Sequence, residues 1–424
     1  MWEKIALVFK VKELRKKIFF VLFLLVIFRL AANIPLPGVN LEQLKRLFEG
    51  NQFLGLLNMF SGGGLKSISI VLLGVGPYIT ASIIMQILTM VIPALDKLNR
   101  EEGEAGREKF NMWTRWLTVP LAIIQTFGMI TLLKTQHVLG LLSLMQTTEI
   151  IIIATAGTVF LTWLGELITE KEIGNGVSLI IFAGIVAGLP SGISRLMSTF
   201  DSTEVFSYIL FLMIAIATVI GVVIVNEGQR DIPVSYAKRV HGSQMSGGTS
   251  THLPLRVNQA GVIPIIFAIS IMLFPGVIAN FLSHAHNPTV AHLAQSIGNL
   301  FQNKLFYGTM YFLLVVAFTY FYTAVVFDPQ KIAENLQKQG GYIPGIRPGE
   351  PTEEYLNKIM NRITLSGSIF LGAIAVLPLI VQSITNIGNV MTVGGTSILI
   401  VVAVVIEIIK QIESHMVMRN YEGF

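Results

Sequence analysis

Residues 177–189 read VSLIIFAGIVAGL, and the interpretation of this stretch decides how the whole chain is arranged. Its 13 residues carry no charge, but a helix needs about 20 residues to cross the roughly 30 Å of hydrocarbon in a bilayer. The stretch can therefore be a short, tilted membrane span, or a segment that is buried or re-entrant. The sequence on either side of it has to distinguish the two.

The composition of the chain is typical of a membrane protein. Of its 424 residues, 53% are hydrophobic and 13% are charged, against about 25% charged in an ordinary soluble domain. So few charges exclude a pair of soluble globular domains, a disordered chain and a fibre. The sequence contains no cysteine, which excludes disulfides and Cys-based zinc or redox sites. Its basic residues are spread over short segments, so we expect no direct nucleic-acid readout.

Nine other apolar runs are long enough to be predicted as membrane spans. In chain order they are 18–34, 68–92, 116–133, 150–164, 206–225, 260–282, 305–327, 363–381 and 394–409. We interpret the first as a retained span and not as a removed signal, because no small-residue cleavage site follows it.

The distribution of lysine and arginine favours a tenth span at 177–189. These residues accumulate in cytoplasmic loops. With ten spans and a cytoplasmic N-terminus, 23 of them lie in predicted inner segments and 6 in outer ones, leaving aside Arg29 within the first span. Without 177–189 the later loops change sides, and the counts become 14 and 15. The sequence therefore predicts an all-α polytopic membrane protein of ten transmembrane helices with both termini in the cytoplasm.

Ten spans divide into two halves of five, 1–190 and 191–424. Because each half holds an odd number of spans, the second half must be inverted relative to the first, about a pseudo-twofold axis in the membrane plane. A functional path is expected where the halves meet.

Two of the predicted inner loops are long, at about 226–259 and 328–362. Loops of this length without repeats are uncommon unless they have a function. We expect them to dock a cytosolic partner, and solvated linkers are the alternative.

The predicted spans contain little that could serve catalysis or coupled transport. Transporters coupled to ions place charged or titrating groups within the membrane, but here these groups are limited to Arg29 and Glu407, each near one end of its span. His284, His286 and His292 lie in a predicted outer loop without carboxylate support, and we interpret them as surface residues. We therefore expect no catalytic residue, no metal and no cofactor. A secondary transporter for a small solute is the alternative function, and an intramembrane enzyme is a third.

Glycines and prolines interrupt the second and seventh spans. Gly74, Gly76 and Pro77 lie in the second, and the seventh contains Pro264, Pro275 and Gly276. Such residues predict helices that are kinked or able to shift, although ordinary packing through small residues is an alternative. Between the first two spans, an apolar stretch at about 53–64 is too short to cross and ends in three glycines. It predicts either a cap for an opening or a helix lying on the membrane surface.

Four motifs resemble bacterial SecY, the family of the central subunit of the protein-translocating channel. They are NMFSGG at 58–63, GELITEKEIGNG at 165–176, STHLPLRVNQAGVIPIIFA at 250–268 and FYTAVVFDPQKIAENLQKQGGYIPGIRPGE at 321–350. The resemblance runs through nearly the whole chain. It implies a clamshell of two halves around an hourglass pore, which passes unfolded secretory polypeptides across the cytoplasmic membrane. It also implies a lateral gate that releases apolar segments sideways into lipid.

The resemblance assigns roles to particular residues of this sequence. The pore ring would consist of Val75, Ile79, Ile181, Ile185, Ile266 and Ile400. The plug that closes the outer funnel would contain Phe53, Leu54, Leu57, Met59, Phe60, Gly62, Gly63 and Gly64. The lateral gate would lie between the second and third spans on one side and the seventh and eighth on the other, with Thr80, Gln125 and Ser270 in its seam. Packing of polar residues is the alternative for those three.

The resemblance also implies partners. The two inner loops would receive the ribosome or the SecA motor ATPase, through basic residues that include Lys238, Arg239 and Arg347. The membrane subunits SecE and SecG would bind the halves, and signal sequences and unfolded precursor proteins would be the substrates. The loop after Arg239 reads VHGSQMSGGTS and holds fewer basic residues than the family leads us to expect.

Overall fold

The computed structural model describes residues 11–36, 68–100, 103–135, 140, 142–198, 205–236, 239–241, 244–246, 250–282, 288–385 and 395–422. Each of the ten predicted spans overlaps one helix. In chain order these helices are α2 (Lys12–Ala32), α5 (Gly76–Val91), α7 (Gly103–Thr135), α8 (Leu144–Thr169), α9 (Gly176–Ser198), α10 (Val205–Glu227), α11 (Ile263–Leu282), α13 (Lys304–Val326), α15 (Glu350–Thr385) and α16 (Gly395–Glu422). The shorter helices α6 (Pro93–Arg100), α12 (Pro288–Gln302) and α14 (Pro329–Lys338) lie between them.

The helices differ in how well their length and composition suit a membrane. Within the described residues, the stretches long and apolar enough to cross one are Leu144–Thr169, Tyr208–Glu227, Lys304–Lys338 and Glu350–Val381. Shorter apolar stretches within α5, α9 and α11 cover Gly76–Val91, Gly176–Gly192 and Ile263–Met272. The chain is thus a helical protein with several apolar helices, and the number of crossings stays a prediction.

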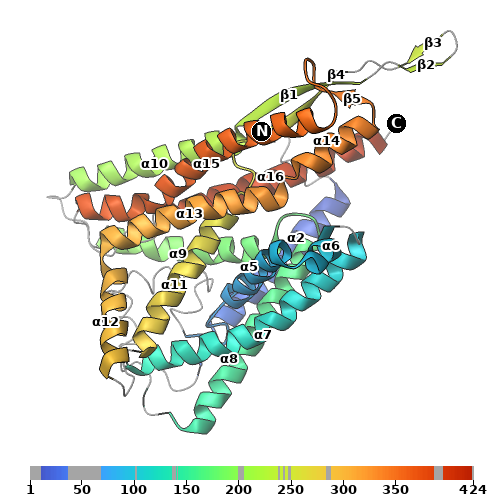
Figure 1. Ribbon diagram of the computed structural model, residues 1–424. Coiled ribbons are helices and arrows are strands. Elements are labelled where there is room, and N and C mark those ends of the chain that lie inside the picture. The colour runs from blue at the N-terminus through green and yellow to red at the C-terminus, as the bar shows by residue number, and fades with distance from the viewer. Residues whose placement is uncertain are drawn as a thin grey trace.

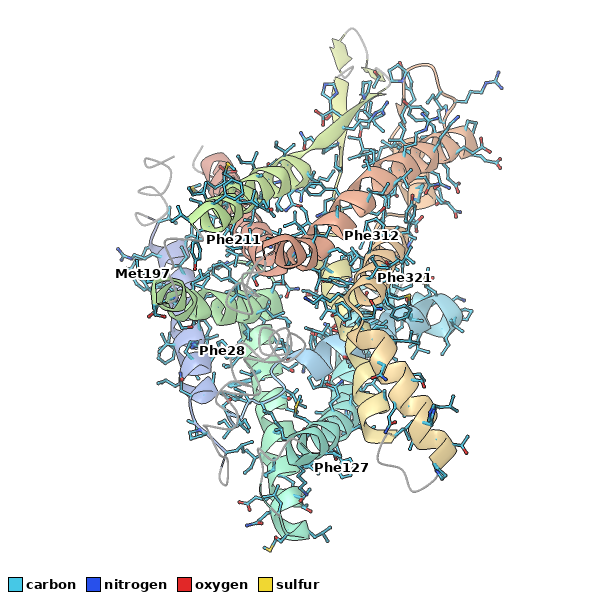
Figure 2. All side chains as sticks on the ribbon, turned by 90° about the vertical axis from the view of Figure 1, so that its left-hand side faces the viewer. Phe28, Phe127, Met197, Phe211, Phe312 and Phe321 are labelled. Carbon is cyan, nitrogen blue, oxygen red and sulfur yellow. The ribbon has the colours of Figure 1, made fainter. Side chains whose placement is uncertain are left out.

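The long helices form two groups, which Figure 1 separates clearly. In one group α13 packs on α15 and α10 packs on α16, and in the other α7 packs on α5 and α8. Two helices lie between the groups and contact both of them. α9 packs on α8 and α16, and α11 packs on α5, α7 and α13. Figure 2, turned by 90°, shows the same separation, with Phe28 and Phe127 in one group and Phe211 and Phe312 in the other.

The second predicted span is helical only from Gly76 onward, so the prediction of a continuous span over 68–92 was wrong for its first residues. Residues 68–75 form turns instead. Gly74 adopts a φ of 57°, a left-handed conformation that glycine takes at little cost. Pro77 lies in the first turn of α5, where its missing N–H would have no helical partner. The glycines and proline that predicted a kink therefore mark the start of the helix.

The two long inner loops contain strands and helices that the sequence analysis did not predict. β1 (Gln229–Tyr236) and β4 (Ser250–Arg256) belong to the first loop, and β5 (Gly341–Tyr342) belongs to the second. They form one sheet in the order β4-β1-β5, with β1 antiparallel to both neighbours. A further pair, β2 (Arg239–His241) and β3 (Gln244–Ser246), follows β1.

The two loops also share a hydrophobic core. Ile232 and Val234 of β1 belong to the same buried cluster as Leu336 of α14 and Leu356 of α15. We call the sheet, α14 and the first turns of α15 the loop lobe. Gly341 permits the close pairing of β5 with β1, since a Cβ there would lie 3.0 Å from the Tyr236 ring. The two predicted loops therefore fold together as one unit.

Candidate functional site: an aliphatic cluster between the helix groups

The six residues of the predicted pore ring come from four helices or their ends. Val75 directly precedes α5, and the Ile79 N–H donates to its carbonyl oxygen at 3.0 Å, which sets the two one helical turn apart. Ile181 and Ile185 are likewise one turn apart on α9. Ile266 lies on α11 and Ile400 on α16. A four-residue spacing presents both members of a pair on one helix face.

All six side chains belong to one extended buried hydrophobic cluster. Val75 is fully buried, and Ile79 and Ile266 are each 5% exposed, the largest exposed fraction in the set. None of the six faces the outside of the helix groups. The cluster also receives side chains from α2, α8, α13 and α15, so both groups contribute to it.

Two further residues of this cluster lie one helical turn beyond predicted ring residues. Ile83 follows Ile79 on α5, Val404 follows Ile400 on α16, and both are buried. The sequence analysis did not select them. The same four-residue spacing that supported the chosen pairs could have found them.

The three residues predicted for the lateral gate lie on helices that meet. α11, which carries Ser270, contacts both α5, which carries Thr80, and α7, which carries Gln125. Thr80 and Ser270 are buried and Gln125 is half-buried. The Thr80 hydroxyl donates to the carbonyl oxygen of Gly76 on its own helix at 3.1 Å. That bond is equally compatible with a packing role for Thr80, so the gate stays a prediction.

The motif GELITEKEIGNG forms a tight turn between α8 and α9. A Cβ on Gly176 would lie 1.8 Å from the Gly165 carbonyl oxygen, so the two backbones approach more closely than any side chain allows. The Thr169 hydroxyl donates to Gly165 O and accepts from Gly176 N, both at 2.9 Å. Asn175 begins α9 by accepting a hydrogen bond from Ser178 N at 3.1 Å.

This turn contacts the first and the last described helices. The Lys17 ammonium of α2 lies 3.2 Å from the Glu172 carboxylate. On α16, His415 Nε2 lies 3.0 Å from the Glu172 carbonyl oxygen, and Glu407 accepts a hydrogen bond from the Asn175 backbone. The turn therefore joins segments that are far apart in the sequence. Glu407, one of the few ionisable residues predicted within a span, has a structural partner there.

The remaining predicted site residues lie away from the aliphatic cluster or outside the residues that the structure describes. The plug stretch at 53–64 and Lys238 lie outside the described residues, as do His284 and His286. Arg239 is in β2 and Arg347 is exposed between β5 and α15, where its carbonyl oxygen accepts a hydrogen bond from the Thr352 hydroxyl at 2.8 Å. His292 is on α12 and not in a loop. The described part of the chain contains no group of His, Cys, Asp and Glu suited to hold a metal ion.

Comparisons with known proteins add relatives that cover the whole chain. The SecY family model matches residues 69–409. The chain is 43% identical over 435 residues to the protein translocase subunit SecY of Halalkalibacterium halodurans, covering 100% of both proteins. It is also 43% identical to the protein translocase subunit SecY of Thermotoga maritima, covering 100% of this chain and 98% of that protein.

Solved structures share the fold at lower identity. A protein-conducting channel matches with a TM-score of 0.64 and 18% identity, covering 95% of this chain and 92% of that one. Sec61 in the canine ribosome-channel complex from the endoplasmic reticulum matches with a TM-score of 0.62 and 17% identity, covering 95% and 92%. The predicted class, an all-α polytopic membrane protein, is thereby confirmed. With its aliphatic cluster and its full-length relatives, this chain belongs to the SecY family.

Proposed function

We propose that this chain is the polypeptide-conducting subunit of a translocase in the cytoplasmic membrane. It passes unfolded secretory polypeptides through the membrane and releases apolar segments sideways into lipid. The observation that carries this proposal is the extended buried cluster to which all six predicted ring residues belong. Relatives that match along their full length are protein translocase subunits, and the comparisons give the transporter alternative no support.

An aliphatic constriction suits a substrate that contains every kind of side chain. A ring that bound one charge tightly would stall the passing polypeptide, whereas methyl groups can exclude water and ions while the pore is empty. Direct passage through lipid would leave each unpaired backbone group unsatisfied at a cost of several kcal/mol. A water-filled path removes that cost for an extended segment.

In the proposed arrangement the halves 1–190 and 191–424 enclose the pore, and both termini are cytoplasmic. The lateral gate lies between α5 and α7 on one side and α11 and α13 on the other. The contacts of α11 with α5 and α7 support this placement. The stretch at 53–64 is the plug. A solved SecY structure whose plug domain stabilises the closed state matches this fold with a TM-score of 0.62 at 19% identity, which supports a plug in this chain.

The loop lobe is the proposed docking surface for the SecA motor or the ribosome. Arg347 supports this role because it is exposed at the edge of the lobe. Two solved channels of this fold, canine Sec61 and yeast Ssh1, are bound to ribosomes. In this scheme these partners supply the energy for transport, and the chain itself uses no cofactor. SecE and SecG are proposed as the membrane subunits that accompany it.

Reconstitution tests the proposal directly. Proteoliposomes that contain this chain, its small membrane partners and SecA should protect a secretory precursor from added protease when ATP is present. Vesicles without this chain are the matched control, and a run without ATP separates transport from binding. Uptake of a small solute down a gradient, with no protection of the precursor, would contradict the proposal.

A further inference from the structure

Helix α12 (Pro288–Gln302) connects α11 to α13 and runs across their ends. Figure 1 shows it at the left, at the end of the molecule away from the strands of the loop lobe, and Figure 2 shows it beside α11 from the perpendicular direction. None of its 15 residues is an aspartate, glutamate, lysine or arginine. The helix therefore carries no formal charge when His292 is neutral.

The surface of α12 divides into three sides. The first packs against the neighbouring helices. Ala294 is buried, and a Cβ on Gly298 would lie 3.8 Å from the Cβ of Ala279 on α11. The rings of Phe301 and Phe306 meet edge to face, with their centroids 5.4 Å apart. This side holds α12 against both α11 and α13.

The second side exposes large apolar residues. Leu293 is 61% exposed, Ile297 is 44% exposed and Leu300 is 51% exposed. Their positions differ by four and three residues, so they form one stripe along the helix. The third side exposes polar residues without formal charge, and its members are His292, Gln295, Ser296 and Asn299.

The corner between α12 and α13 fixes the direction of the apolar stripe. The Asn303 side chain caps α13 by accepting hydrogen bonds from Leu305 N at 3.0 Å and Phe306 N at 3.4 Å. The Asn303 N–H donates to the last turn of α12, to Leu300 O at 3.2 Å. The helix cannot turn its apolar stripe inward without breaking these bonds and the ring contact.

We propose that α12 is an interfacial helix that lies in the headgroup region of the leaflet opposite the loop lobe. The stripe of Leu293, Ile297 and Leu300 inserts among the upper acyl chains, and the polar side faces water. A helix with one apolar and one polar side binds a bilayer in this way. The proposal rests on the membrane placement in the proposed function, but not on the pore or its substrate.

Continuity with the lipid-facing surface of the long helices supports a lipid occupant over a protein partner. The first turn of α13 exposes Leu305 at 82%, and Leu313, two turns further on, is 54% exposed. At the other side, the last residue of α11, Leu282, is 36% exposed. Because α12 links α11 directly to α13, its stripe lies near the ends of these helices and, in the proposed placement, meets the same bilayer.

The absence of cysteine from the chain permits a clean test, because a single introduced cysteine is the one labelling site. Ile297→Cys and Leu300→Cys report on the apolar stripe, and Gln295→Cys and Asn299→Cys are matched controls on the polar side of the same helix. Each variant of the full chain is labelled with the environment-sensitive fluorophore NBD and reconstituted in vesicles of phosphatidylcholine and phosphatidylglycerol. Part of the phosphatidylcholine carries a nitroxide near the headgroup end of its acyl chain.

We expect the nitroxide lipid to quench the labels at 297 and 300 at least about threefold more strongly than those at 295 and 299, with aqueous iodide giving the opposite order. Equal access of iodide to all four labels would overturn the proposal. Protection of 297 and 300 from iodide without quenching by nitroxide lipid would overturn it too, and would identify a second copy or another protein as the occupant. If Ile297→Cys fails to fold, Leu293→Cys reports on the same stripe. Translocation of a precursor is measured in parallel. If the proposed function is wrong, transport is absent but the quenching by nitroxide lipid is unchanged, so the two proposals fail separately.

Discussion

Ile79 is the residue at which the proposed pore can be tested most directly. It is 5% exposed in the shared cluster, whereas Ile87, two turns further along the same helix, is 38% exposed on its outer side. Comparing the same substitution at the two positions therefore separates the effect of a change inside the cluster from the effect of a change on the outer side of the helix.

We expect Ile79→Asn to raise the resting ion conductance of reconstituted channels severalfold, because a polar side chain favours water in a constriction that methyl groups keep dry. Ile87→Asn is the matched control and should leave the resting conductance near that of the unchanged chain. Planar bilayer recordings of both variants measure this. Equal currents from the two variants would remove the argument that Ile79 lines a path for ions or polypeptides.

At the scale of elements, the loop lobe couples two distant parts of the chain, the first and the second long inner loop. Leu356 of α15 is fully buried in the lobe core together with Ile232 and Val234 of β1. Lys358, two residues further on, is exposed. A partner that binds one loop therefore acts on a folded unit to which both loops contribute.

Leu356→Ala should destabilise this unit by about 2–5 kcal/mol, the usual cost of removing a large buried aliphatic side chain. Amide hydrogen exchange should then become faster in β1 and β4, which lie a hundred or more positions earlier in the sequence. Lys358→Ala removes an exposed side chain from the same helix and should leave these rates unchanged. Faster exchange confined to α14 and α15 would mean that the two loops are stabilised separately.

At the scale of the whole molecule, the orientation in the membrane depends on whether 177–189 crosses. In the proposed topology Lys304, at the start of α13, lies outside, and Lys338, at the end of α14, lies inside. Both side chains are exposed, so each position can accept a cysteine label.

In intact spheroplasts, a membrane-impermeant maleimide should label Lys304→Cys, and it should label Lys338→Cys only after the membrane is permeabilised. We expect this pattern because a topology of ten spans places 23 basic residues on the inner side and 6 on the outer side. The unchanged cysteine-free chain provides the background signal. The reverse labelling pattern would mean that 177–189 does not cross or that the orientation is inverted.

The resemblance to a family assigned the residues of the candidate site, and local spacing supported only the pairs within it. Pairs such as Ile181 and Ile185 lie on one helix face because they are four residues apart, and this holds wherever the helix packs. Nothing local brings Ile266 of α11 to the same cluster as Ile400 of α16, so the resemblance to a family was needed to predict it. The three glycines that end the plug stretch belong to a part of the chain that the structure does not describe, and that prediction is still to be tested.

The sequence by itself determined the membrane class, the positions of the apolar helices and the family, because hydrophobicity, charge and motifs are local properties of the chain. Tertiary structure decided what depends on contacts between distant residues. The pairing of β5 with β1 needs Gly341 to pass within reach of the Tyr236 ring, and the turn at Gly176 is held against α16 through Asn175 and Glu407. Such contacts are absent from any local window of sequence, since the chain must fold before the residues that make them are neighbours.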